Sequence, residues 1–248
     1  MRTLNISDFF RVLPLAVTIL LASGIFASAE DAKPILHVRK IANDFKVTGE
    51  PDGKAWKDVA WTPLRLRTGE HDGYAARVKM QYSATGIYVL MDSTDRKITA
   101  SIDKDFENLW TEDVFEFFFW TDEQWPVYFE YEISPLGREL PIIIPNFNGK
   151  FFGWLPWHYE GKRKTKTAVT VQGGKQETGA TITQWTAEVY VPYDLFEPLQ
   201  NVPPKSGTRW RANFYRVDYD DEKQSSWDWA RVGPSFHEYK KFGTLVFE

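Results

Sequence analysis

The sequence predicts an all-β fold, a two-sheet antiparallel β-sandwich of jelly-roll type with long loops and little helix. Short segments of alternating apolar and polar residues recur along the chain, separated by turns rich in Gly, Pro, Asp and Asn. The 248 residues include 18 Phe, 11 Trp and 11 Tyr but no Cys, so a large apolar core must hold the fold without disulfides. No internal repeat or long linker interrupts the pattern, which indicates one domain.

The first strands are predicted to form a hairpin at residues 76–82 and 87–91, joined by a turn at Thr85 and Gly86. One or two helical turns, opened by Pro192, are expected at residues 192–196. Two long loops, at residues 94–109 and 136–166, are expected to carry ligand contacts, because long loops on a rigid sandwich are common binding elements. Further strands are expected at residues 113–120, 127–134, 167–172, 181–191, 208–217 and 242–247.

Strand alternation divides the side chains of these segments into two faces. The apolar face is expected to fill the core with Phe115, Phe117, Phe119, Phe129, Tyr131, Ile133, Trp185, Val189, Trp210 and Phe214. The opposite face carries Glu116, Glu130, Glu132, Glu188, Arg211 and Asn213 among Trp120, Tyr128, Tyr190 and Tyr215. If these strands are neighbours, that face is either a ligand-binding surface or an ordinary solvated face with cross-strand ion pairs.

The N-terminus has the pattern of a secretory signal peptide at residues 1–29. Arg2 and Arg11 accompany an apolar run over residues 12–26, and Ala27-Ser28-Ala29 provides an A-x-A cleavage site. Cleavage there would leave a single mature domain at residues 30–248 without a membrane span, exported to the periplasm or the extracellular space. The alternative is an uncleaved anchor, although the run is short for a bilayer. A formal net charge of −4 without a basic run argues against nucleic acid as a partner.

The C-terminal forty residues combine aromatic rings with hydrogen-bonding side chains. Residues 209–218, 226–229 and 236–247 alternate Trp, Phe and Tyr with Arg, Asn, His and carboxylates. Such a mixture suits a neutral polyol such as a sugar, since ring faces stack on C–H surface and polar groups bond hydroxyls. Trp154 and Trp157, in the second long loop, are further candidates for sugar contact.

Four stretches of the chain resemble the carbohydrate-binding modules of family 9, in particular single-domain exported members. Residues 110–118 (WTEDVFEFF) resemble W-x-x-D-x-x-E-x-F, and residues 128–137 (YFEYEISPLG) resemble Y-x-E-F-E-I-N-P-x-G. Residues 185–192 (WTAEVYVP) resemble W-T-V-E-I-A-I-P. At the C-terminus, residues 210–216 resemble W-R-x-N-F-Y-R and residues 236–247 resemble F-H-x-P-x-x-F-G-x-L-x-F, with Tyr239 in place of Pro.

The resemblance implies non-catalytic binding of a mono- or oligosaccharide by a monomer, in support of polysaccharide breakdown. It implies that Trp110 is a stacking ring and that Glu116 accepts sugar hydroxyls. Phe236, with His237 beside it, stands where the family has a second Trp, and Glu132 stands where some members have Arg. The acid, amide and guanidinium partners of the family point to Glu132, Arg211 and Asn213 as further sugar-binding residues.

Some members of the family bind calcium, and no other cofactor is expected. Asp92, Asp95 and Asp103 are the candidate oxygen ligands, although their spacing is not that of an EF-hand. With only four His in the chain, a histidine-based metal site is not expected.

Three other functions stay open at this stage. A glycoside hydrolase acting on O-glycosyl bonds would use two carboxylates from Glu116, Glu130, Glu132, Glu188 and Asp113, whose separation the sequence does not fix. A haem-binding sandwich would need axial ligands, whereas Met80 and Met91 have the pattern of core residues. The third alternative is a structural surface domain whose sugar site has decayed.

Overall fold

The computed structural model describes residues 32–69 and 73–248. The signal peptide predicted at residues 1–29 lies outside these residues. Residues Lys33–Glu248 form one compact unit. In the described part of the chain, no helix is long and apolar enough to cross a bilayer.

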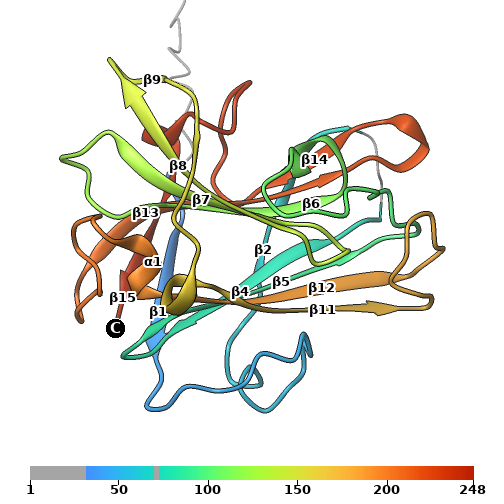
Figure 1. Ribbon diagram of the computed structural model, residues 1–248, viewed down its shortest axis with the longest axis horizontal. Coiled ribbons are helices and arrows are strands. Elements are labelled where there is room, and N and C mark those ends of the chain that lie inside the picture. Colours follow the sequence, from blue (N-terminus) through green and yellow to red (C-terminus); the bar gives the residue numbers. More distant parts are fainter. Residues whose placement is uncertain (1–31, 70–72) are drawn as a thin grey trace, which may run out of the picture. The chain divides into compact units, whose positions relative to one another are not determined.

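Two antiparallel β-sheets, stacked as layers, make up this unit (Figure 1). The first sheet has the strand order β10-β8-β7-β6-β13-β15. Its members are β6 (Val114–Trp120), β7 (Val127–Ile133), β8 (Glu139–Phe147), β10 (Leu155–Pro156), β13 (Arg209–Asp218) and β15 (Gly243–Phe247). The second sheet has the order β4-β5-β12-β11, formed by β4 (Ala76–Tyr82), β5 (Gly86–Thr94), β11 (Lys166–Gln172) and β12 (Gln184–Pro192).

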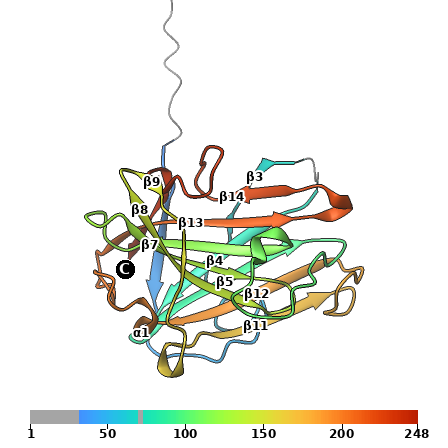
Figure 2. The same cartoon turned by 45° about the horizontal axis from the view of Figure 1, so that its top comes forward.

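The remaining elements are short and lie at the edges of the two sheets. Strand β14 (Ser225–Asp228) pairs with one end of β13 and with β3 (Arg65–Thr68), and the three run side by side in Figure 2. Strand β9 (Lys150–Phe151) pairs with β8, and β2 (Thr62–Pro63) pairs with β4. The helical pieces are α1 (Tyr193–Phe196), η1 (Leu109–Thr111), η2 (Gly161–Arg163), η3 (Asp220–Glu222) and η4 (Tyr239–Lys241).

Strand β1 (Ile35–Lys40) connects the two sheets. Its first half is parallel to β15, with Ile35 opposite Thr244, and its second half is parallel to β4, with Arg39 opposite Gln81. These are the parallel pairings in a fold that is otherwise antiparallel over the described residues. The expected all-β sandwich is therefore confirmed, with one strand shared between its layers.

The core between the layers contains the apolar face predicted from strand alternation. All ten predicted core residues are buried, and they pack in one cluster with side chains from the opposite sheet. Phe115 stacks on Trp185 across the layers at 3.9 Å between ring centroids, and Phe117 stacks on Tyr131 of the neighbouring strand at 4.7 Å. Met80 and Met91 also lie in this core, as predicted.

The prediction of one long loop at residues 136–166 was wrong, because this segment contains β8, β9 and β10. Strand β8 is nine residues long and pairs with the whole length of β7. Pro141 and Pro145 interrupt its sequence, and proline inside a strand pattern argues against a strand because it has no N–H to donate to the ladder. The three consecutive isoleucines between the two prolines favour a buried strand, and this pattern prevails over the prolines.

The polar face predicted for one sheet is divided between the two sheets. Glu188 and Tyr190 belong to β12 in the second sheet, not to the sheet of β6, β7 and β13. There Glu188 accepts hydrogen bonds from the indole Nε1 of Trp56 at 2.7 Å and from the backbone amides of Thr48 and Gly49. These hydrogen bonds attach the N-terminal segment to the second sheet, and Glu188 does not line the pocket described in the next section.

The outer face of β6, β7 and β13 is covered by loops and is not solvated. Phe118, Tyr128 and Tyr215 are fully buried there and form a second apolar cluster with residues of the covering segments. The side chains of Trp120 and Tyr239 pack edge to face at 4.6 Å within it. A sheet face that carries several glutamates therefore lies inside the protein.

Candidate functional site

A pocket of about 530 Å³ opens onto this loop-covered face. Its floor is the sheet itself, through Glu116 of β6, Glu130 and Glu132 of β7, and Ile142 of β8. Its walls come from segments far apart in the sequence, namely Arg67, Trp110, Phe151, Trp154, Val217, Tyr219, Gln224, Ser226, Pro234, Ser235, Phe236 and His237. The site predicted from sequence and this pocket share six residues: Trp110, Glu116, Glu132, Trp154, Phe236 and His237.

The floor of the pocket is a cluster of buried acids. Glu116 and Glu132 are directly opposite each other in the ladder, and Glu130 lies two residues along β7 on the same face. Both carboxyl oxygens of Glu132 and the Oε2 of Glu130 have no well-formed hydrogen bond, although the two carboxyls interact with each other and Glu132 interacts with the backbone of Trp110. An unpartnered buried acceptor costs about 1–3 kcal/mol, so these atoms are available to a ligand.

Burial changes the ionisation of all three acids. It raises the pKa of Glu116 to about 8. Burial, together with the neighbouring carboxyl of Glu116, raises the pKa of Glu130 and of Glu132 well above the usual value for glutamate. Glu116 is therefore protonated at neutral pH, and a protonated carboxyl both donates and accepts a hydrogen bond.

Positive charge near these acids is scarce among the described residues. The Nδ1 of His237 lies 3.7 Å from the Oε2 of Glu130, but burial lowers the pKa of His237 to about 4, so the imidazole is neutral. The guanidinium of Arg67 donates to the carbonyl of Gly233 at 2.5 Å and to the hydroxyl of Ser226 at 3.3 Å. It forms no ion pair with the glutamates of the floor.

Aromatic rings form the rim of the pocket. Trp110 and Trp154 meet edge to face at 5.9 Å, and both are partly exposed. Phe151, which also lines the pocket, stacks on His237 at 4.1 Å. Phe236 stacks on Tyr215, with ring centroids 4.1 Å apart and planes inclined by 5°, and the Arg67 guanidinium lies 5.0 Å from the Phe236 centroid.

Local hydrogen bonds hold the ring-bearing segments against the sheet. Trp110 lies on the single turn η1, and its carbonyl accepts a hydrogen bond from the hydroxyl of Tyr219 at 3.0 Å. Tyr219 in turn accepts one from the side chain of Gln224 at 3.1 Å. On the other side, Tyr215 donates to the carbonyl of Phe236 at 2.9 Å. The rim is thus positioned by residues of β13 and its continuation.

Three predicted sugar-binding residues lie outside this pocket. Arg211 donates to the carbonyl of Phe242 and to the hydroxyl of Thr244 at 3.3 Å, and it does not pair with Glu116. Asn213 is fully buried and bonds the backbone of Ala230 in both directions, with donor–acceptor distances of 2.8 Å. Both brace the loop-covered face.

Trp157 is the third such residue. Its indole Nε1 donates to the carbonyl of Leu195 at 2.6 Å, and its ring packs against the core between the sheets. Conversely, sequence analysis missed Arg67, Phe151, Tyr219, Gln224 and Ser226, which line the pocket. No local pattern marks them, because strand pairing and loop packing bring them to the site. Glu130 also lines the pocket, and its place on the polar face of the strand pattern could have indicated this.

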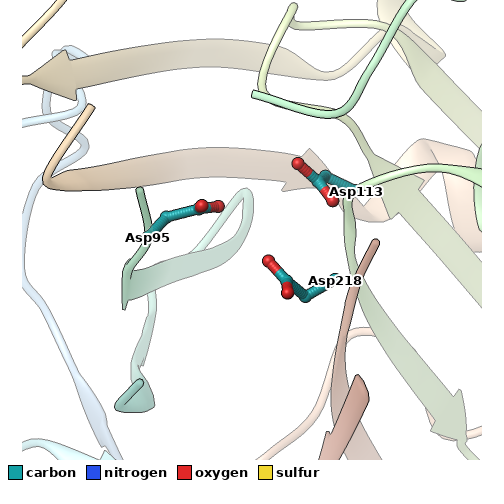
Figure 3. Close-up of side chains that lie close together, drawn as sticks. All are labelled: Asp95, Asp113 and Asp218. Atoms are coloured by element: carbon teal, nitrogen blue, oxygen red, sulfur yellow. The ribbon is translucent and has the colours of Figure 1, made fainter. Parts of the chain in front are cut away.

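The predicted calcium ligands do not come together. Asp92 accepts hydrogen bonds from Arg77 Nε and from the Thr186 hydroxyl, both at 2.7 Å, and Asp103 is exposed at another place. Among the described residues, the acid side chains with oxygens within 4.8 Å of one another are Asp95, Asp113 and Asp218 (Figure 3). Only one predicted ligand belongs to that group.

A buried arginine pairs with two of these three aspartates. The Nη2 of Arg216 donates to Asp95 at 2.6 Å and to Asp218 at 2.8 Å, and all three side chains are fully buried. Asp113 accepts from the backbone amides of Thr99 and Tyr219. Burial raises the pKa of Asp95 to about 6 and that of Asp113 well above its usual value, and Arg216 opposes both shifts. The group has the composition of an internal ion-pair cluster.

Comparison with known proteins then identifies the family. The sequence profile of carbohydrate-binding family 9 matches residues 54–247, which is most of the chain. The chain belongs to carbohydrate-binding family 9. The family assigns carbohydrate binding, in general without catalysis, as the class of function.

Solved structures agree with this family 9 fold. A candidate carbohydrate-binding protein from Bacteroides uniformis superposes with a TM-score of 0.72 at 18% identity, covering 88% of this chain and 100% of that chain. A family 9 module from Caldicellulosiruptor kristjanssonii, solved with cellotriose and with glucose, superposes with a TM-score of 0.61 at 12% identity. In the cellotriose complex the match covers 86% of this chain and 93% of the module.

A curated relative is also similar in sequence. An extracellular protein from Arthroderma benhamiae is 27% identical over 148 residues, which are 57% of this chain. The match spans 63% of the length of that relative.

Proposed function

We propose that this family 9 protein is exported and holds a mono- or oligosaccharide, without catalysis, in the pocket over β6, β7 and β13. The observation that carries the proposal is the convergence of a partly exposed tryptophan rim and carboxyls without well-formed hydrogen bonds on one pocket of about 530 Å³. The extracellular relative supports export. A monomer that contributes to polysaccharide breakdown is part of the same proposal.

The rings of the rim would supply apolar contact with the sugar. Trp110 and Trp154 present an edge-to-face pair at the opening, where a pyranose can lay its C–H surface against an indole. Removing apolar surface from water contributes about 25 cal/mol per Å². This contact selects a ring-shaped ligand but not a particular pattern of hydroxyls.

The carboxyls of the floor would supply the polar contacts. A protonated carboxyl pairs with a sugar hydroxyl in both directions, because each group can donate and accept. Glu116 and Glu132, opposite each other in the ladder, can engage neighbouring hydroxyls of one sugar ring. Such bonds would satisfy the buried oxygens that lack well-formed hydrogen bonds in the protein.

Calorimetric titration tests the proposal, starting with glucose and cellotriose because the Caldicellulosiruptor module was solved with both. Wild-type protein is compared with Trp110→Ala and with Glu116→Leu, whose side chain can neither donate nor accept, and each is expected to weaken binding more than tenfold. Trp125→Ala is the matched control, since Trp125 is 58% exposed and lies outside the pocket. Unchanged affinity of Trp110→Ala, or a glycan array on which the wild type binds nothing, would refute the proposal.

A further inference from the structure

We infer that the pocket is selective for a cationic sugar, a protonated amino sugar in which an ammonium group replaces a hydroxyl. This inference rests on the proposed sugar-binding function of the pocket and names its ligand class. It rests on a difference between the buried acids on the floor of the pocket and the buried acids in other parts of the protein.

Buried acids outside the pocket are supplied with donors by the protein itself. Glu139 accepts hydrogen bonds from the hydroxyls of Tyr131, Tyr159 and Thr165. Glu188 accepts from an indole and two backbone amides. Of the aspartates in Figure 3, Asp95 and Asp218 share the guanidinium of Arg216, and Asp113 accepts from two backbone amides.

The acids on the floor of the pocket receive fewer hydrogen bonds from the protein. Glu130 and Glu132 leave three buried oxygens without a well-formed hydrogen bond, and no Lys or Arg among the described residues forms an ion pair with them or with Glu116. The nearest basic ring, that of His237, is neutral. A cation brought by the ligand would stabilise the ionised form of these acids, for which the described residues provide no ion-pair partner.

The rim suits the same ligand. The electron-rich faces of Trp, Tyr and Phe attract ammonium groups, and a ring of such side chains is a common cage for organic cations. Trp110, Trp154 and Phe151 line the same pocket as the acids. An ammonium on a sugar ring would therefore meet rings and acids in one pocket, and its charge would favour release of a proton from a floor carboxyl.

A metal ion fits these acids less well than an ammonium. The oxygens of Glu116, Glu130 and Glu132 are not gathered within 4.8 Å of one another, whereas those of Asp95, Asp113 and Asp218 are. A small ion needs its ligands around one point. An ammonium has three N–H donors and is carried on a ring with further hydroxyls, so it can serve carboxyls that are spread over a floor.

The experiment compares three trisaccharides of equal length and linkage by calorimetry at pH 6. These are the β-1,4-linked trimers of glucosamine, of N-acetylglucosamine and of glucose. We expect the glucosamine trimer to bind at least tenfold more tightly than cellotriose, and the acetylated trimer, which lacks the charge, to lose that advantage.

Two variants assign the effect to the floor. Glu132→Gln keeps the shape of the acid but cannot carry charge, and it should reduce the preference for the glucosamine trimer over cellotriose to less than threefold. Glu188→Gln removes a buried acid from the other sheet and should leave that preference unchanged. An unchanged preference in Glu132→Gln would overturn the inference.

The outcomes separate this inference from the proposed function. Equal or tighter binding of cellotriose, lost in Trp110→Ala, would overturn the selectivity for a cation and leave sugar binding in place. No binding of any of the three trimers would overturn both.

Discussion

Glu116 of β6 and Glu132 of β7 lie directly opposite each other beneath a layer of loops, and neither is more than 2% exposed. Like charges at opposite positions of a ladder destabilise a sheet. Burial adds to this cost, raising the pKa of Glu116 to about 8, so the pair is tolerated in its protonated form. The stability of the fold and the chemistry of the pocket are therefore linked through the same two side chains.

The first prediction is that stability falls as the pH rises from 5 to 9. Over this range an unfolded chain has released the Glu116 proton, whereas the folded protein holds it until about pH 8, so the folded state binds more protons. Glu116→Gln imitates the protonated acid and should show a smaller fall. Melting temperatures of both proteins at each pH give the comparison, and parallel curves would contradict the prediction.

The second prediction concerns the core between the sheets. Phe117 is fully buried and stacks on Tyr131, so Phe117→Ala should lower the free energy of unfolding by about 3–5 kcal/mol. Phe152→Ala is the control, since that ring is 73% exposed and its loss should change stability by less than about 0.5 kcal/mol. Urea unfolding measures both. A small effect at Phe117 would mean that the faces of β6 are reversed.

Strand alternation predicted that core because it is a local property. Phe115, Phe117 and Phe119 recur with a period of two, and any sandwich must turn such a face inward. The same rule located Glu116 and Glu132 on the opposite face. The family resemblance adds Trp110 and Phe236, which line the same pocket as these glutamates.

What sequence analysis missed depends on pairing between distant segments. Glu188 has the same alternation as Glu116 but joins the second sheet, because β12 pairs with β5 and β11. Arg67 reaches the pocket since β3 pairs with β14, about 160 residues later in the chain. Arg211 and Asn213 match the family motif, but their side chains donate hydrogen bonds to backbone carbonyls of the covering loops.

The third prediction is that Arg216→Met destabilises the protein strongly. Removing one partner from a buried ion pair typically costs about 3–5 kcal/mol, because the other charge remains uncompensated. The loss should be smaller at pH 5 than at pH 8, since the pKa of Asp95 is about 6 and protonation removes its charge. Arg163→Met, which breaks a surface pair with Glu197, should cost less than about 1 kcal/mol. Equal losses at both pH values would contradict the assigned role.

The fourth prediction addresses calcium. Arg216 already supplies positive charge to Asp95 and Asp218, and Asp92 is held by Arg77, so the fold does not depend on a bound cation at these acids. Melting temperatures measured with calcium and with a chelator should agree within error. A clearly higher melting temperature with calcium would contradict the prediction and show that the folded protein binds the ion.

The fifth prediction separates the two aromatic positions that the family motif equates. One face of Phe236 is already covered by Tyr215 at 4.1 Å, and Arg67 lies over the ring, whereas Trp110 meets its neighbour Trp154 edge to face. Phe236→Ala should therefore weaken sugar binding by less than threefold while lowering stability, since a stacked aromatic pair contributes about 0.5–1.5 kcal/mol beyond its burial. Trp110→Ala should show the reverse balance, with affinity reduced more than tenfold. Calorimetry and thermal unfolding of the two variants side by side test this. A Phe236→Ala protein that melts like the wild type but binds no sugar would contradict the prediction and make Phe236 a second stacking ring.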